Sequence, residues 1–384
     1  MLRMLLTAVA MATLGVLPVF LLGAQFVLIS DELHLDARHL GIAVGIFFAS
    51  AALAAAPAGY VADRFGARIG MVAAGVLAGL GTASMAVGVV SFAGLLAAIT
   101  LAGVGNAALQ MTANATLARS IPRRRQGIAF GIKQSAVPLA ILLGGLAVPG
   151  IGLVLGWRWT YAISAICAAL IALAALASRA AKTAPRIGRG EHAPRRALIV
   201  TAVATTLANA SATALGAFLP AWTFQAGMPP GESGLLLALA AGLCLGGRIL
   251  NGAAGDRRNG KNMLVVAAQM AAGAIGFALL AQPTMPLLIA GALIAFGFGW
   301  SWPGLLIFAV VRVGRDRPAF ASSSVQTGGF AGGAFGPPLF GWLVSATSFE
   351  TGWLTAGAVM LVAASLLLYA RRIFLQDLAA RPLP

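Results

Sequence analysis

Charged side chains are scarce in this chain. Only 9% of its 384 residues are Asp, Glu, Lys or Arg, against about 25% in a typical soluble domain, whereas 60% are hydrophobic. So few charges cannot cover a water-exposed surface, but a bilayer accepts an apolar exterior if every backbone group is hydrogen-bonded internally. The composition therefore excludes a water-soluble fold and favours helices that span a membrane.

Cysteine and the common catalytic motifs are also scarce or missing. The two cysteines, Cys167 and Cys244, lie in separate apolar segments and indicate neither a disulfide framework nor a metal site. The three histidines lack metal-ligand spacing, and no phosphate-binding loop is present in the sequence. We therefore expect neither an enzyme nor a bound cofactor, and nothing implies ATP hydrolysis.

Acidic residues number ten against 26 Lys and Arg, which gives a formal net charge of +16. Such a charge could indicate nucleic-acid binding, but the basic residues are scattered between apolar segments rather than gathered on one domain. We expect no nucleic-acid partner. The positions of the basic residues instead indicate how the chain crosses the membrane.

Twelve apolar runs are long enough to cross a bilayer, which takes about 20 residues in a helix. The first is too long for a signal peptide and is interpreted as a membrane helix. The pattern predicts an all-α polytopic membrane protein. Its spans cover roughly 4–30, 40–62, 69–90, 92–118, 127–152, 158–179, 197–225, 233–255, 262–281, 286–311, 318–346 and 351–370.

The Lys and Arg residues test this assignment, because cytoplasmic loops of membrane proteins are enriched in them. With the N-terminus inside, 22 of the 26 fall in cytoplasmic segments, and only Arg38 and Arg158 fall outside. Lys133 and Arg248 remain within predicted spans. The alternation predicts a multi-pass protein of a bacterial inner membrane with both termini in the cytoplasm.

The longest polar segment, residues 181–196, divides the chain into two similar parts. We predict an N-terminal six-helix bundle over 1–180 and a cytoplasmic linker over 181–196. A C-terminal six-helix bundle follows over 197–372, and a cytoplasmic tail over 373–384.

Two predicted cytoplasmic loops, after the second and eighth spans, share the pattern G-x-x-x-D-R and lie 193 residues apart. Equal loops at equal places in two halves indicate duplication. The first loop also matches nearly all of G-x-x-x-D-R-x-G-R, the cytoplasmic motif of the major facilitator superfamily, and the chain resembles that family over its whole length. The candidate gating or latch residues in these two loops are Gly59, Asp63, Arg64, Gly66, Arg68, Gly252, Asp256 and Arg257.

This resemblance implies twelve helices in two pseudo-symmetric bundles that rock about a central site. Asp63 and Asp256 can then pair with an arginine or a helix end across the cytoplasmic side and latch one state. The alternative for each loop is a plain turn with an arginine that extends to the membrane surface.

The sequence departs from the family pattern in two spans. Ile99 stands where the fourth helix usually carries an arginine, and residues 131–138 replace a Gly-Pro-rich motif of the fifth helix. Both differences argue against a drug and proton antiporter. A Gly-x-x-x-Gly-Pro pattern occurs instead in the eleventh span, at Gly332, Gly336 and Pro337, where it predicts close packing and bending.

Lys133 and Arg248 are the main candidates for a substrate site. Each lies roughly 9–12 Å from the predicted cytoplasmic helix end, counted at about 1.5 Å per residue. All ten acidic residues fall in loops or at helix ends, so none can neutralise these cations. The resemblance makes helices 5 and 8 neighbours, and Arg248 is similar to the helix 8 arginine of oxalate and monocarboxylate carriers. The alternative is that both side chains snorkel or that Arg248 caps carbonyls.

Further polar and aromatic residues lie at a compatible depth. Asn106 and Gln110 share one helix face, although hydrogen bonding between helices explains such a stripe equally well. Of Trp300 and Trp302, at most one is expected to contact substrate, because they face different sides of a helix. The candidate substrate-binding residues are Lys133, Gln134, Arg248, Gln110, Asn106, Asn209, Trp300, Trp302 and Gln326.

The leading hypothesis is secondary or facilitated transport of a small organic anion, of which a carboxylate is the expected kind, by alternating access. Arg suits a carboxylate because its planar fork bonds both oxygens, while Lys adds a point charge. The first alternative is export of an amphipathic, drug-like compound, and the second is a membrane receptor that transports nothing. The expected partners are the solute and the lipid bilayer, with the chain acting as a monomer.

Overall fold

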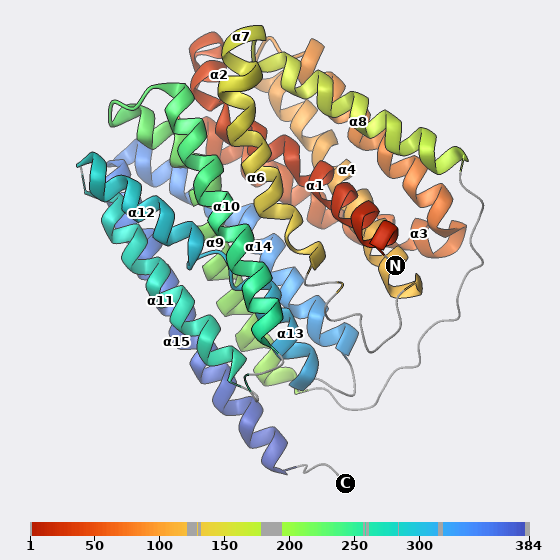
Figure 1. Cartoon of the computed structure of the whole chain (residues 1–384), viewed down its shortest axis with the longest axis vertical. Coiled ribbons are helices and arrows are strands. Elements are labelled where there is room, and N and C mark those ends of the chain that lie inside the picture. Colours follow the sequence, from red (N-terminus) through yellow and green to blue (C-terminus); the bar gives the residue numbers. More distant parts are fainter. Residues whose placement is uncertain are drawn as a thin grey trace.

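The computed structural model describes residues 2–120, 129, 132–177, 194–255, 258, 261–282, 284–313 and 318–380. Its helices form two groups, one for each half of the chain (Figure 1). The first half contains α1 (Leu2–Ala24), α2 (Phe26–Leu33), α3 (Ala37–Val87), α4 (Phe92–Ser120), α6 (Ala136–Ala147), the π-helix η1 (Val148–Gly152), α7 (Leu153–Leu155) and α8 (Trp157–Ala177). The second half contains α9 (Arg195–Gln225), α10 (Pro230–Gly255), α11 (Asn262–Leu280), α12 (Met285–Gly297), α13 (Pro303–Val313), α14 (Pro318–Ala346) and α15 (Phe349–Ala380).

Among the described residues, ten segments are long and apolar enough to cross a membrane. They coincide with the first nine predicted spans and with the twelfth. The predicted eleventh span corresponds to α14, a helix of 29 residues that is richer in Gly and Ser. The predicted linker, residues 181–196, lies mostly outside the described residues, as does the tail beyond residue 380.

The second and third predicted spans form one element, α3, although the sequence predicts a loop between them. The chain nevertheless reverses its direction there. A Cβ placed on Gly70 would lie 3.4 Å from the Cα of Ala62, whereas eight residues of straight helix span about 12 Å. The motif loop is therefore a tight helical turn, and α3 crosses twice, over Ala37–Ala62 and Arg68–Val87.

The tenth predicted span is broken, which the sequence interpretation missed. It consists of α12 and α13, separated by residues 298–302, and the second piece begins at Pro303. Proline lacks the N–H that a continuous helix needs and is favoured at a helix start. Trp300 and Trp302 therefore lie in a turn between two short helices and not on a regular helix.

Polar contacts join α2 to α8 at one end of the first half. Trp157 Nε1 and Arg158 Nη1 donate to one carboxylate oxygen of Glu32, at 2.8 and 2.7 Å, and Arg158 also bonds the carbonyl of Val89. The hydrogen bonds from Arg158 and then Trp157 lower the pKa of Glu32. We call this end the Glu32 end, and the end that carries Arg68, Arg196 and Lys261 the basic end.

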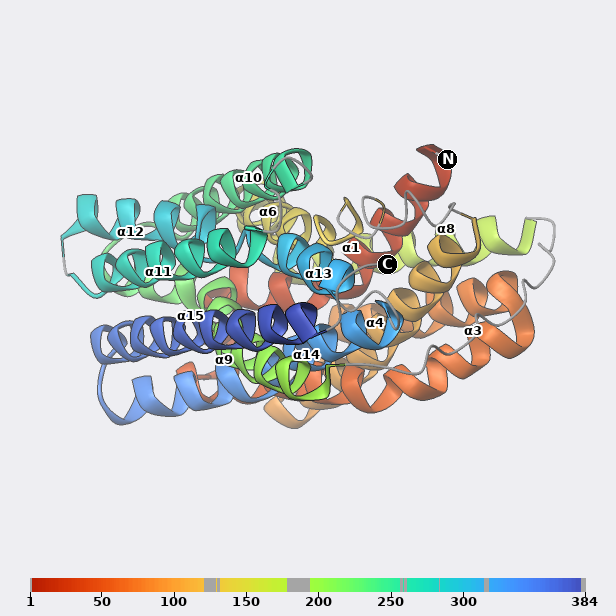
Figure 2. The same ribbon diagram turned by 90° about the horizontal axis from the view of Figure 1, so that it is seen from below.

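The two halves meet mainly along three pairs of helices, α1 with α9, α3 with α14, and α6 with α10 (Figures 1 and 2). Glycines allow these contacts, since small residues let helix backbones approach closely. A Cβ on Gly23 would lie 2.7 Å from the carbonyl oxygen of Ala217, and one on Gly41 would lie 2.4 Å from that of Pro337. We refer to the second and third pairs as the α3–α14 seam and the α6–α10 seam.

Candidate functional site

The α6–α10 seam is closed over most of its length. Near the Glu32 end, a Cβ on Gly145 would lie 2.5 Å from the Gly234 carbonyl oxygen, and a Cβ on Gly234 would lie 2.7 Å from that of Gly145. The two backbones therefore pack directly on each other. The contact continues toward the basic end as far as Arg248 on α10 and Gln134 beside α6.

Arg248 is buried at the basic end of this contact, with 7% of its surface exposed. Its Nε and Nη2 donate to the carbonyl of Trp300 at 3.3 and 2.9 Å, and its Nη1 donates to the carbonyl of Gln134. Trp300 belongs to the second half and Gln134 to the first, so one guanidinium joins the two halves. Arg248 thus caps carbonyls in this conformation, and an anion would have to compete with them.

Lys133 precedes Gln134 and is also buried, with 3% of its surface exposed. Among the described residues, neither Lys133 nor Arg248 pairs with a carboxylate. The structure therefore brings the two predicted cations to the same level of one seam. A buried charge without a counter-ion is costly, which makes this place suitable for an anion.

The two tryptophans of the broken span have different surroundings. Trp300 reaches across to Phe20 of α1, with ring centroids 5.9 Å apart, and a Cβ on Gly216 would touch both rings. Trp302 is fully buried, and its Nε1 donates to the carbonyl of Gly299 at 2.8 Å. Of the two, Trp300 lies beside the Arg248 contact, and Trp302 packs within the second half.

Three other predicted site residues lie in contacts between helices of the same half. Asn106 is buried against Gly15 of α1, and its Oδ1 has no hydrogen-bond partner among the described residues. Gln110 donates to the carbonyl of Ala12 at 3.3 Å. Asn209 lies on α9 against α14, where a Cβ on Gly329 would be 2.8 Å from its Nδ2. None of these contacts includes Lys133 or Arg248.

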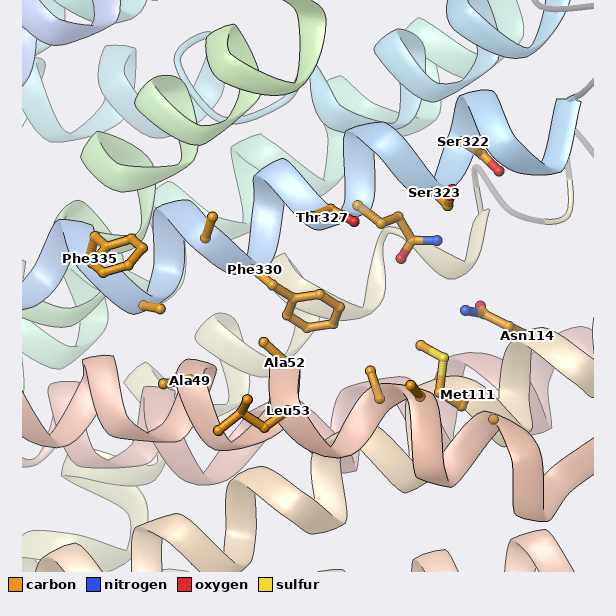
Figure 3. A pocket seen from close by; sticks show the side chains of 16 residues that line it. Ala49, Ala52, Leu53, Met111, Asn114, Ser322, Ser323, Thr327, Phe330 and Phe335 are labelled. Carbon is orange, nitrogen blue, oxygen red and sulfur yellow. The ribbon is translucent and has the colours of Figure 1, made fainter. Parts of the chain in front are cut away.

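The α3–α14 seam differs because it contains an open cavity of about 820 Å³. Residues 49–59 of α3 and residues 322–335 of α14 line it, together with Met111 and Asn114 of α4. Ser322 and Asn114 lie toward one end and Ala49 and Phe335 toward the other (Figure 3). Of the predicted substrate-binding residues, Gln326 lines this cavity.

The described residues of the predicted latches make contacts within one half. Arg64 Nη1 donates to the hydroxyl of Tyr60 at 2.9 Å, and Arg68 donates to the carbonyl of Leu176 on α8. Gly59 lines the cavity, and a Cβ on Gly252 would meet nothing within 4 Å. The described parts of the structure do not include Asp256, Arg257, or the side-chain environments of Asp63 and Gly66.

The features that sequence reasoning missed are the broken tenth span and most of the cavity lining. The break could have been found from Gly297, Gly299 and Pro303, because such residues interrupt membrane helices near binding sites. The cavity wall on α3 consists largely of Ala49, Ala52, Ala55 and Ala56, which carry no signal in a sequence so rich in alanine.

The structure contains two groups of membrane-crossing helices that meet along seams. A cavity and buried cations lie between the two groups, and this arrangement is that of a polytopic membrane transporter. The model of the Major Facilitator Superfamily matches residues 4–311 and 201–376. The chain therefore belongs to the major facilitator superfamily, and it is a transporter and not an enzyme.

Curated relatives are similar over most of their length. The chain is 26% identical to a putative tartrate transporter from Agrobacterium vitis, over 91% of this chain and 86% of that one. It is 27% identical to a chloramphenicol resistance protein from Streptomyces lividans, over 96% and 95%.

Solved structures share the fold. A bacterial homologue of the human lysosomal transporter Spinster, in an inward-facing and unoccupied conformation, has a TM-score of 0.75 at 17% identity, and the match covers 98% of each chain. A D-xylose–proton symporter has a TM-score of 0.73 at 17% identity, over 94% of this chain and 96% of the other. At this level of identity the likeness concerns the fold alone.

Proposed function

We propose that this transporter carries a small organic anion, with a carboxylate as the expected chemistry, by alternating access. The observation that carries the proposal is the meeting of two buried cations, Lys133 and Arg248, at one level of the α6–α10 seam without a carboxylate among the described residues. A bound acid supplies the missing negative charge. Arg248 offers the bidentate fork and Lys133 a point charge.

The tartrate transporter relative supports this substrate class, since tartrate is a dicarboxylate. Trp300 lies at the same place and can form one wall of the site. We also propose that the basic end faces the cytoplasm of a bacterial cell, because 22 of the 26 Lys and Arg residues fall on the side so assigned.

Uptake into proteoliposomes tests the proposal. Labelled tartrate, oxalate and lactate would be compared with threitol, the uncharged reduced counterpart of tartrate, in vesicles with the wild-type chain, with Arg248→Gln and without protein. We expect at least one acid to accumulate only with the wild-type chain, and threitol not to accumulate. Transport of threitol without transport of any acid would contradict the anion assignment.

Export of an amphipathic compound is the second candidate function, and the cavity favours it. Its volume of about 820 Å³ falls within the range of about 300–1,000 Å³ that drug-sized ligands occupy, and most of its lining is apolar. One relative of this chain is named a chloramphenicol resistance protein, and this name supports export of a drug-like compound. Raised resistance of overexpressing cells to lipophilic compounds, lost in Ala52→Trp and accompanied by no acid uptake, would favour this function over the first.

A further inference from the structure

Both carbonyls that Arg248 holds lack a helical donor. In a regular helix the carbonyl of Gln134 would accept from the N–H of residue 138, but residue 138 is proline and has none. The carbonyl of Trp300 lies in the break before Pro303. No backbone N–H among the described residues donates to either oxygen. Arg248 therefore satisfies one buried acceptor, the Trp300 carbonyl, and one partly buried acceptor, the Gln134 carbonyl, which would otherwise lose hydrogen-bond energy.

The guanidinium has one edge left for a carboxylate. Arginine carries five N–H groups, and the edge formed by Nε and Nη2 is taken by the Trp300 carbonyl. A carboxylate bound by two parallel hydrogen bonds must then use Nη1 and Nη2. Nη1 carries two N–H groups and already donates to the carbonyl of Gln134, so a carboxylate oxygen on Nη1 would lie beside that carbonyl oxygen, and the two acceptors repel each other.

We propose that the Arg248–Gln134 hydrogen bond is a releasable bridge between the two halves, which a carboxylate opens when it takes Nη1. This inference rests on the proposed function, because the releasing ligand is the transported anion. Lys133, adjacent to Gln134, draws the anion to the bridge. Occupied carriers thus lose the bond that ties α6 to α10, whereas empty carriers keep it, so the anion promotes the movement that carries it.

Pro138→Ala tests the bridge without altering either cation. The alanine supplies the N–H that a helix directs at the Gln134 carbonyl, and this donor competes with Arg248. Pro220→Ala is the matched control, because Pro220 also lies in a membrane helix, α9, at a place remote from the bridge in sequence. Correct folding of each variant would be checked by monodispersity and thermal melting.

The readout is the separation of spin labels at Ile132 and Leu250, exposed residues close in sequence to Lys133 and Arg248 at the bridged end of the seam, in a chain whose Cys167 and Cys244 are replaced. Without ligand, we expect one short separation in the wild type and in Pro220→Ala, and an added population with a longer separation in Pro138→Ala. Tartrate should add the same population to the wild type, and threitol should not.

The two ways to fail are distinguishable. An unchanged separation in ligand-free Pro138→Ala would overturn the bridge, whatever the acids do. A longer separation in Pro138→Ala, combined with no response of the wild type to tartrate, oxalate or lactate, would overturn release by a carboxylate and with it the proposed substrate class.

Discussion

The α3–α14 and α6–α10 seams both join the two halves but differ in how far they stay closed. On α3, direct contact with α14 runs from Ala37 to Phe48, and the cavity begins at Ala49. On α10, contact with the first half runs from Gly231 to Arg248, which is about 25 Å of helix. One seam has parted toward the basic end, and the other is still tied there.

The difference shows which chemistry closes each seam. The contacts that are common to both consist of glycine packed against backbone, and they lie toward the Glu32 end. Only the α6–α10 seam adds a hydrogen bond from a charged side chain among the contacts described. Packing closes one end of the transporter, and the hydrogen bond from Arg248 to the Gln134 carbonyl ties one seam toward the other end.

The largest effect is expected from glycine substitutions that separate the seams. In Gly145→Ala and Gly41→Ala the new Cβ would lie 2.5 and 2.4 Å from a backbone oxygen of the facing helix. Overpacking of this kind costs about 1–3 kcal/mol, which shifts a two-state equilibrium by about 5–150-fold. We expect the Glu32 end to open, which labelling of engineered cysteines from each side would measure. We also expect transport to fall in the uptake assay.

Gly246→Ala on α10 is the control for these substitutions, because a Cβ there would meet nothing within 4 Å. It should transport as the wild type does. Equal loss in Gly246→Ala and Gly145→Ala would show that the effect comes from helix composition and not from the seam.

A several-fold effect is expected from the two motif aspartates, Asp63 and Asp256, which follow the second and eighth predicted spans in the sequence. We predict that Asp63→Asn and Asp256→Asn slow or bias the conformational cycle while leaving substrate affinity largely intact, because their predicted place is a latch and not the site. Cysteine accessibility from the two sides of the membrane would show the bias. Full transport with unchanged accessibility in both variants would remove the latch assignment.

The smallest effect concerns Glu32, which links helices of one half and not the seams. The folded-state pKa of Glu32 is lowered, so its ion pair with Arg158 stabilises the folded state fully at pH values above the unfolded-state pKa of about 4.3. This contribution disappears as the pH falls through the folded-state pKa. At pH 7, Glu32→Gln should cost no more than about 1 kcal/mol, as for other surface pairs. Melting temperatures at pH 7 and at pH 3 would check it.

Glu350→Gln is the matched control, since no ion pair of Glu350 is present among the described residues. Its melting temperature should stay close to that of the wild type at both pH values. If Glu32→Gln lowered the melting temperature by as much at pH 3 as at pH 7, the loss of stability would not come from the charged pair of Glu32 and Arg158.

Hydropathy and charge predicted most of the fold, because a membrane span is a local property of about 20 residues. The packing of the eleventh span was also predictable: a Cβ on Gly336 would lie 2.4 Å from the Cα of Ala210. The tight reversal within α3 and the break at residues 298–302 were missed, because both depend on how the backbone bends and not on how apolar it is.

The candidate site was predictable to the extent that it depends on charge. Lys133 and Arg248 stood out because ionisable residues inside spans are rare. Which carbonyls Arg248 holds could not be foreseen, since Gln134 and Trp300 come near it only through the approach of α6 and the broken span to α10. The cavity wall of alanines carries no chemical signature at all.

The most direct test of the anion site is calorimetric titration of the best-transported acid, with tartrate tried first, into the wild type, Arg248→Gln and Lys133→Gln. Truncating one partner of a buried charge pair costs about 2–5 kcal/mol, so each variant should lose affinity by more than tenfold. Arg248→Lys should lose less than Arg248→Gln, because it keeps the charge without the fork. Lys133→Arg should be tolerated better still. Wild-type affinity in both Arg248→Gln and Lys133→Gln, with folding intact, would contradict an anion site between these residues.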